Sequence, residues 1–242
     1  MELYKEQICK LRLTDFNCYK QLRASAVLDL FQDLATEHSV EMGIGFEDLQ
    51  KKGVFWVVVR QKLEFFPDAV YKPHQEVCVR TWPHSASRLN IQRDYSLSDL
   101  DGNMLAKGTS EWLLLDIETR GIASVLANYD GPTDFLPDRM FSGKLRKIKD
   151  FEAAEQPTAV IMPQFSDIDF NLHVNNARYI DYTQNVASPT QDRPVRTLQI
   201  DYRKEILPGH PVNIFTMEDE LGTHVKGVNA EGEVNFNCLM GY

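Results

Sequence analysis

Hydrophobic positions in the first half of the chain change from a helical period to a strand period. Between residues 25 and 39, apolar side chains and one histidine recur at steps of three and four, so they share one face of a predicted helix. From residue 54 to residue 66 the period becomes two, and the residues are mostly β-branched or aromatic, which predicts a strand. A hairpin with its turn at Asp101-Gly102 follows. The face of the predicted helix consists of Val27, Phe31, Leu34 and His38.

The second half of the chain repeats this order. Residues 175–187 are predicted to form a second helix, with Asn175 or Asn176 as its N-cap. Residues 195–207 return to a period of two, and a last hairpin turns at Glu231-Gly232. The face of the second helix consists of Tyr179, Ile180, Thr183, Val186 and Ala187.

A three-residue repeat supports an internal duplication. Asp-Phe-Asn occurs at residues 15–17 and again at residues 169–171, each time shortly before a predicted helix. Aligning the halves on these letters places Tyr19 opposite His173, so only one of the two loops carries an imidazole. We therefore predict an α+β chain of two fused halves, each with one central helix wrapped by a curled antiparallel sheet, similar to a tandem (double) hotdog fold.

A polar segment with several Gly and Pro residues separates the halves and is predicted to be a linker. We expect an N-terminal repeat at residues 1–116, the linker at residues 117–157 and a C-terminal repeat at residues 158–242. The alternative is two α+β domains whose similarity is coincidental.

Composition and charge exclude several functional classes. The 242 residues are 43% hydrophobic and 25% charged, as in ordinary globular proteins, and the net charge of −9 argues against nucleic-acid binding. The charged start of the chain does not resemble a signal peptide, and the longest apolar run, residues 54–59, is too short to span a membrane. The four cysteines form no CxxC pair, which favours reduced thiols and a cytoplasmic location.

The stretch DIDFNLHVNNARYIDY, residues 167–182, is the main candidate for chemistry. It starts like a calcium-binding EF-hand loop, but Leu172 and Arg178 occupy the positions that require Gly and Glu. No second His and no Cys lies near His173 to complete a zinc site. Glycine-rich phosphate loops and a G-x-S-x-G motif are also absent from the sequence. We therefore expect no metal and no cofactor.

Two interpretations of this stretch remain. In the first, its Asp and Asn residues form Asx turns and cap the helix, and His173 is an incidental loop residue. In the second, Asp169 and His173 point to the same side of an extended segment and activate a water molecule. The helix N-terminus would then stabilise the oxyanion that forms on a carbonyl group. This is the equipment of acyl hydrolysis without a Ser or Cys nucleophile.

The motif D-x-N-x-H-V-N-N-x-x-Y-I, residues 169–180, resembles the signature of the acyl-acyl-carrier-protein thioesterases of plant plastids and bacteria. WVVVR at residues 56–60 resembles their W-V-x-x-R strand, and IDYRKE at residues 200–205 is similar to their Y-R-R-E segment. The resemblance covers essentially the whole chain. It implies a tandem hotdog that hydrolyses the thioester of fatty acyl-acyl carrier protein and releases a free fatty acid.

The resemblance also implies roles for individual residues. Glu205, expected in the strand after the second helix, or Asp169 would act as general base on water, and we leave this choice open. His173 would orient the water or substrate and return the proton to the thiolate, while Asn171 would hold the geometry. Plant members carry Cys after that Glu, and this chain has Ile206, which favours water as the attacking group. Alternatively, Glu205 is a surface acid that pairs with the neighbouring Arg or Lys.

Substrate and partner residues follow from the same resemblance. An apolar acyl slot is expected between the first helix and its sheet, although bulky apolar residues there are more often plain core. Because acyl carrier protein is acidic, its docking needs a local basic patch, which the linker supplies unless its charges are only solvated surface. The candidate acyl-binding residues are Leu30, Leu34, Phe55 and Val57, and the candidate docking residues are Lys144, Arg146, Lys147 and Lys149.

Three rival functions share the predicted fold. An acyl-CoA thioesterase would use the same chemistry with another thiol carrier. A non-catalytic acyl-binding regulator would be expected to carry a DNA-binding segment, and a hotdog dehydratase would release an enoyl product instead of a thiol. Acyl chain length, saturation and homodimerisation are left open by the sequence.

Overall fold

The first half of the protein folds as one long helix against five strands. The computed structural model describes residues 2–242. Helix α1 confirms the helix predicted for residues 25–39, and β2 confirms the strand that follows it. The elements are β1 (Lys5–Lys10), the 3-10 turn η1 (Leu13–Asp15), α1 (Ala24–Glu41), α2 (Phe46–Gln50), β2 (Val54–Phe65), β3 (Glu76–Pro83), β4 (Asn90–Asp99) and β5 (Met104–Asp116).

The second half repeats this arrangement around α4, whose N-cap is Asn175, one of the two predicted candidates. A short strand and one helical turn lie between the halves. No helix within residues 2–242 is both long and apolar enough to cross a membrane. The elements are β6 (Ile122–Ala123), α3 (Val125–Asn128), β7 (Ala159–Ile161), η2 (Phe165–Asp167), α4 (Asn176–Ala187), β8 (Thr197–Tyr202), β9 (Val212–Asp219), β10 (Gly222–Val228) and β11 (Val234–Gly241).

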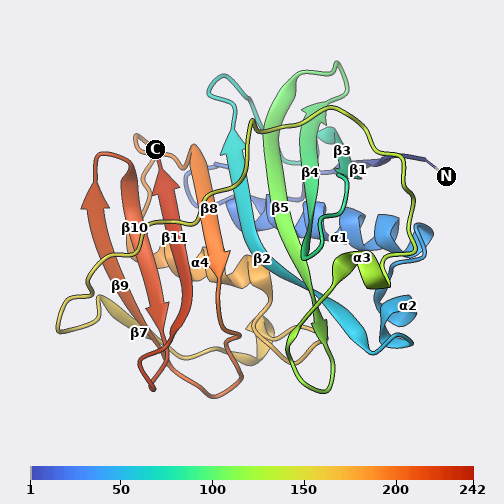
Figure 1. Ribbon diagram of the computed structural model, residues 1–242. Helices are drawn as coiled ribbons and strands as arrows, with labels where there is room; N and C mark the ends of the chain where they lie inside the picture. The colour runs from blue at the N-terminus through green and yellow to red at the C-terminus, as the bar shows by residue number, and fades with distance from the viewer. Residues whose placement is uncertain (1) are drawn as a thin grey trace.

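The strands of both halves form one antiparallel sheet. Its order is β1-β3-β4-β5-β2-β8-β11-β10-β9-β7, with β6 paired to β5. The halves join through β2 and β8, from Arg60 opposite Asp201 to Glu64 opposite Thr197. Helices α1 and α4 contact each other and lie against the same face of the sheet (Figure 1). The predicted tandem hotdog is therefore confirmed, with its two sheets joined edge to edge.

The helices pack on this face through aromatic side chains. Phe31 of α1 stacks on Tyr95 of β4, with ring centroids 4.8 Å apart. A Cβ atom on Gly108 of β5 would lie 2.7 Å from the Phe31 ring, so only glycine admits the ring at this point. In the second half, Tyr179 of α4 meets the ring of Tyr202 edge to face at 5.2 Å.

The linker between the halves crosses the outer face of the sheet, opposite the helices (Figure 1). Side chains on the outer face of the sheet form hydrogen bonds with the backbone of the linker. Arg60 donates from Nη1 to the carbonyl of Leu145 at 3.2 Å, and Asp201 accepts the amide of Ile148 at 2.8 Å. The linker is thus fixed across the junction of the two halves.

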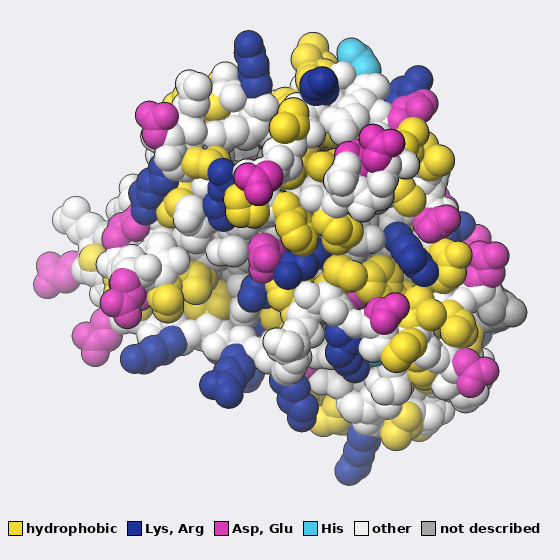
Figure 2. Space-filling view, turned by 90° about the horizontal axis from the view of Figure 1, so that it is seen from above, with side chains coloured by type: hydrophobic (Ala, Val, Ile, Leu, Met, Phe, Trp, Pro, Cys, Tyr) yellow, Lys and Arg dark blue, Asp and Glu magenta, His cyan; other side chains and the backbone are white. Residues whose placement is uncertain are grey.

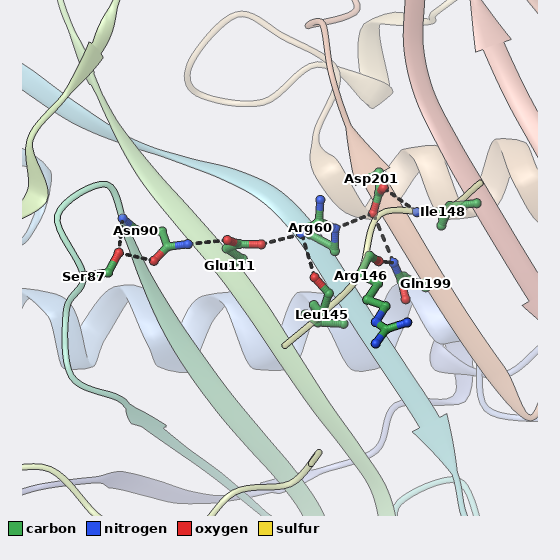
Figure 3. A network of polar contacts seen from close by, with 9 residues as sticks. All are labelled: Arg60, Ser87, Asn90, Glu111, Leu145, Arg146, Ile148, Gln199 and Asp201. Atoms are coloured by element: carbon green, nitrogen blue, oxygen red, sulfur yellow. Dashed lines mark hydrogen bonds and ion pairs between the residues drawn. The ribbon is translucent and has the colours of Figure 1, made fainter. Parts of the chain in front are cut away.

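Arg60 is the centre of a buried ion network at this junction (Figure 3). Its Nε donates to Asp201 Oδ1 at 2.7 Å, and its Nη1 donates to Glu111 Oε2 at 2.5 Å. Arg60 and Asp201 are only 7% and 3% exposed. One guanidinium therefore joins β2, β5 and β8 to the linker.

Backbone hydrogen bonds correct the predicted alignment of the two halves. In the loop before α1, the amide of Asn17 donates to the carbonyl of Gln21 at 2.9 Å, and in the loop before α4 the amide of Asp169 donates to the carbonyl of His173 at 2.8 Å. Isolated β-bridges flank both loops in the same way. His173 therefore takes the place of Gln21, and the prediction that it corresponds to Tyr19 is wrong. The repeated Asp-Phe-Asn letters lie at different positions of two loops that share one conformation.

A buried histidine and arginine meet in the first half. Arg93 of β4 donates from Nη1 to Nδ1 of His38 on α1 at 3.1 Å, and His38 is 2% exposed. Burial lowers the pKa of His38 to about 4, and the positive charge of Arg93 acts in the same direction. The folded protein therefore keeps this imidazole neutral in mild acid.

We expect His38 to make the protein less stable in mild acid. Below about pH 6.5 the unfolded chain protonates this histidine, whereas the folded protein does not until about pH 4. The free energy of unfolding should therefore fall by up to about 1.4 kcal/mol per pH unit across this window as pH decreases. The free energy of unfolding is measured by urea denaturation for the wild type and for His38→Asn, which keeps an acceptor oxygen near the position of Nδ1. It should depend less steeply on pH in the variant. Parallel profiles would contradict the assignment.

Candidate active site

The Asp- and Asn-rich stretch forms a tight turn in front of α4. The amide of Leu172 donates to the carbonyl of Asp169 at 3.0 Å, and Leu172 has a left-handed backbone with φ of 64°. The Oδ1 atom of Asp169 accepts the amide of Asn171 at 2.8 Å, which is an Asx turn. Asp169 thus shapes the loop that presents His173.

The first amide of α4 has no hydrogen-bond acceptor within residues 2–242. Asn175 accepts the amide of Ala177 on its side chain and the amide of Arg178 on its carbonyl, at 2.8 and 2.9 Å. The amide of Asn176, the first residue of the helix, donates to no acceptor within residues 2–242. It is therefore available to an oxygen atom placed at the positive end of the helix.

A backbone bond brings the segment after β8 against this loop. The amide of Val174 donates to the carbonyl of Ile206 at 3.0 Å. Beside this bond, Oε2 of Glu205 lies 3.2 Å from Nε2 of His173. The side chains are 38% and 27% exposed, so a substrate can reach both of them. The structure therefore brings together a carboxylate and an imidazole that lie far apart in the sequence.

Glu205 lies in a loop, and its predicted place in the strand is wrong. The amides of Arg203 and Lys204 both donate to the carbonyl of Asn235, at 2.8 and 3.1 Å, so the regular ladder of β8 has already ended. In the part of the chain that the structure describes, neither of these cations pairs with Glu205, and Lys204 contacts Glu233 instead. The loop turns Glu205 away from the sheet and toward His173.

Arg120 is a site residue that the sequence did not reveal. It lies in the turn between β5 and β6, with a left-handed φ of 56°, and its Nη2 donates to both oxygens of Glu205, at 2.6 and 2.8 Å. Its guanidinium also lies 4.9 Å from the ring centroid of Phe55 on β2. The turn that follows the last strand of the first half thus supplies the residue that holds the carboxylate of the second half. No local pattern signals a contact of this kind between the halves.

Asp169 and Glu205 both act on the buried hydroxyl of Tyr179. This hydroxyl accepts the amide of Ile206 at 3.0 Å. Burial raises the pKa of Tyr179, and the negative charges of Glu205 and Asp169 raise it further. The bond from Ile206 ties the segment that carries Glu205 to α4. Asn171 differs from the two carboxylates, because it is exposed and its side chain makes no hydrogen bond within residues 2–242.

The four predicted acyl-binding residues lie in different surroundings. Leu34 is 2% exposed and belongs to the core between α1 and the sheet, and Leu30 packs against the same core. Phe55 and Val57 are half-buried on β2, and Phe55 is the one beside the Arg120–Glu205 pair. Phe55 is therefore a predicted acyl-binding residue that contacts the candidate site.

The predicted docking cations are all exposed and project from the linker. Between them, Leu145 and Ile148 anchor the backbone to the outer face of the sheet. Basic side chains also project along the lower edge of the face seen in Figure 2. The name docking cluster is used below for the four predicted linker cations, Lys144, Arg146, Lys147 and Lys149.

The fold and the site together define a tandem hotdog with an acid–imidazole pair in front of α4, the central helix of its second half. Models of the acyl-ACP thioesterase N-terminal and C-terminal domains match residues 2–131 and 151–238. The chain belongs to the acyl-ACP thioesterase family.

Curated relatives and solved structures agree with this assignment. Oleoyl-acyl carrier protein thioesterase 2 of Arabidopsis thaliana is 25% identical over 93% of this chain, and palmitoyl-acyl carrier protein thioesterase of Gossypium hirsutum is 27% identical over 88%. The chain spans 66% and 53% of the lengths of these two relatives.

Two solved structures share the complete fold. The acyl-ACP thioesterase of Bacteroides thetaiotaomicron superposes with a TM-score of 0.85 at 22% identity, covering 98% of this chain and 96% of that one. The 12:0-ACP thioesterase of Umbellularia californica superposes with a TM-score of 0.82 at 18% identity, covering 100% and 97%.

Proposed function

We propose that the protein hydrolyses the thioester of fatty acyl-acyl carrier protein and releases a free fatty acid. The observation that carries the proposal is the 3.2 Å contact between Glu205 and His173, which lies in the loop before α4. The first amide of that helix, on Asn176, has no acceptor within residues 2–242. Family membership supports the thioester as the bond that is broken. The printed names of the relatives support the carrier protein as the thiol carrier.

The proposed reaction needs only water and the residues of the site. A carboxylate, Glu205 or Asp169, accepts a proton from a water molecule that His173 orients, and the water oxygen attacks the thioester carbon. The amide of Asn176 donates to the oxyanion of the tetrahedral intermediate. The carbon–sulfur bond then breaks, and His173 relays the proton to the departing thiolate. The products are a fatty acid and the free thiol of the carrier.

The contacts of the two carboxylates favour Glu205 as the base. Glu205 contacts His173 directly, and Arg120 fixes its orientation. One oxygen of Asp169 is engaged by the amide of Asn171 in the turn. Asn171 contributes this backbone contact, so we propose that it shapes the loop through its backbone.

The test of the function is a thiol-release assay with acyl chains of increasing length on both acyl carrier protein and CoA. We expect faster release from the carrier-linked chains. Equal or faster release from acyl-CoA would indicate that acyl-CoA is the substrate, and an enoyl product without free thiol would indicate a dehydratase.

All four cysteines are free thiols, which supports the predicted cytoplasmic location.

The docking cluster should contribute to binding of the carrier protein and not to the hydrolysis step. Reversing the charges of the docking cluster should raise KM for carrier-linked substrates by about 10-fold, since acidic partners are guided by local positive charge. Release from CoA should change little. Reversing the charges of Lys51 and Lys72, which are exposed on other parts of the surface, is the control for a change of surface charge alone. An unchanged KM at low salt would remove the linker from the docking surface.

Arg120 should act as a positioning residue. Arg120→Gln removes the two-pronged contact that holds Glu205, so we expect kcat to fall by about 10-fold with little change in KM. Arg120→Lys should recover part of the loss, because it keeps the charge without the two-pronged geometry. If both variants keep the wild-type kcat, the contact has no part in catalysis.

A further inference from the structure

A cavity of about 280 Å³ lies beneath the linker on the outer face of the sheet. Side chains of β2, β4, β5 and β8 form its floor, and residues 139 and 141–146 of the linker form its rim. Four cations line it in a chain whose net charge is −9. These cations are Lys62, Arg139, Lys144 and Arg146.

None of these four cations forms an ion pair with a carboxylate of residues 2–242. Lys62 places its Nζ atom 4.8 Å from the ring centroid of Phe141, and Arg139 donates from Nη1 to Oε1 of Gln92 at 2.9 Å. These neutral partners fix two of the cations at the cavity without cancelling their charge.

The carboxylate that lines the cavity, Asp94, is already engaged. Asp94 is 2% exposed, and its Oδ2 accepts the amide of Met140 at 2.7 Å and lies 2.9 Å from Nε2 of His84. Asp94 is therefore occupied by these two contacts, and it does not neutralise the four cations that line the cavity.

We propose that this cavity binds a small phosphorylated anion, namely the phosphate or pyrophosphate group of a compact metabolite. Lys and Arg donate charge-assisted hydrogen bonds to phosphate oxygens, and a half-enclosed site screens these charges less than open water does. The volume lies just below the range of about 300–1,000 Å³ that is usual for ligand pockets, so it suits a compact anion better than a large nucleotide cofactor.

The anion cavity is separate from the candidate active site. Its floor residues point away from the helices, whereas His173 lies in the loop before α4 on the helix side of the sheet. The proposal therefore does not depend on thioester hydrolysis, and its test uses no thioester. Lys144 and Arg146 also belong to the docking cluster, so the test changes the two cations that do not.

The test is calorimetric titration of the protein with inorganic phosphate, pyrophosphate and succinate at low ionic strength. We expect saturable binding of phosphate or pyrophosphate with a dissociation constant below about 1 mM, and a raised melting temperature in its presence. Lys62→Gln with Arg139→Gln should weaken this binding at least 10-fold. Lys51→Gln with Lys72→Gln, which also removes two positive charges but at exposed lysines on other parts of the surface, should leave it unchanged.

Three outcomes would overturn the proposal. They are no saturable binding to the wild type, unchanged affinity in the double variant, and equal affinity for succinate, which lacks phosphate geometry. If the double variant does not fold, Arg139→Gln alone decides the matter, because Arg139 is exposed and its loss leaves no buried charge. A reduced affinity in that single variant supports the site, and an unchanged affinity rejects it.

Discussion

Replacing His173 with alanine is expected to lower the rate of thioester hydrolysis by about 100- to 10,000-fold, which is the usual contribution of a positioned acid or base. The imidazole lies 3.2 Å from Glu205 and makes that contact at a half-buried position. Its removal should leave the fold intact, because the loop before α4 is held by backbone bonds and by the Asn175 cap. The measurements are kcat/KM by thiol release and the melting temperature of each variant.

The same experiment identifies the base. Glu205→Gln should lower turnover as strongly as His173→Ala if Glu205 removes the proton from water, and the double variant should then lose little more. Asp169→Asn keeps an oxygen for the Asx turn and should have the smaller effect. The opposite order would assign the base to Asp169. His210→Ala, at an exposed histidine in the loop after β8, is the matched control and should keep full activity.

Arg60→Met is expected to destabilise the protein by about 3–5 kcal/mol, the usual result of removing one partner of a buried ion pair. The change leaves the buried carboxylate of Asp201 and the partly buried one of Glu111 without their cation. It also removes one of the contacts that hold the linker over the β2–β8 junction. Because β2 and β8 join the halves, the loss should appear as a lower denaturant midpoint for the whole chain.

An exposed ion pair supplies the control for Arg60. Arg193 and Glu218 contact each other at 2.8 Å with side chains that are 45% and 52% exposed, so Arg193→Met should cost less than about 1 kcal/mol. Asp201→Asn combined with Arg60→Met should recover part of the stability, since the buried charge is then gone. A loss from Arg60→Met no larger than that of the control would show that solvent reaches the network.

Periodicity was enough to predict the two helices and the strands that follow them. Helix α4 begins after Asn175 because an N-cap acts over three residues, and such local rules are visible in the sequence. The edge-to-edge union of the halves also followed, since each half alone leaves a sheet edge uncovered. These features depend on neighbours along the chain or on a general rule of packing.

The remaining features depend on contacts between distant segments. Glu205 was assigned to a strand because the alternating pattern continues past the point where the ladder ends. Arg120 belongs to a surface turn whose partner is fixed only when the halves join. Aligning the halves on three letters gave the wrong partner for His173, because backbone hydrogen bonds and not side-chain identity define the equivalent positions.

The corrected alignment has a consequence for how the two loops diverged. Where the later loop has Asp169 and His173, the earlier loop has Asn17 and Gln21, whose side chains bond to each other at 2.9 Å. In a pair of identical subunits, any substitution would change both loops at once. A single polypeptide removes that constraint, so one copy can exchange its ionisable groups for amides and keep the shared backbone conformation. Covalent joining thus permits a lone reactive centre within a duplicated scaffold.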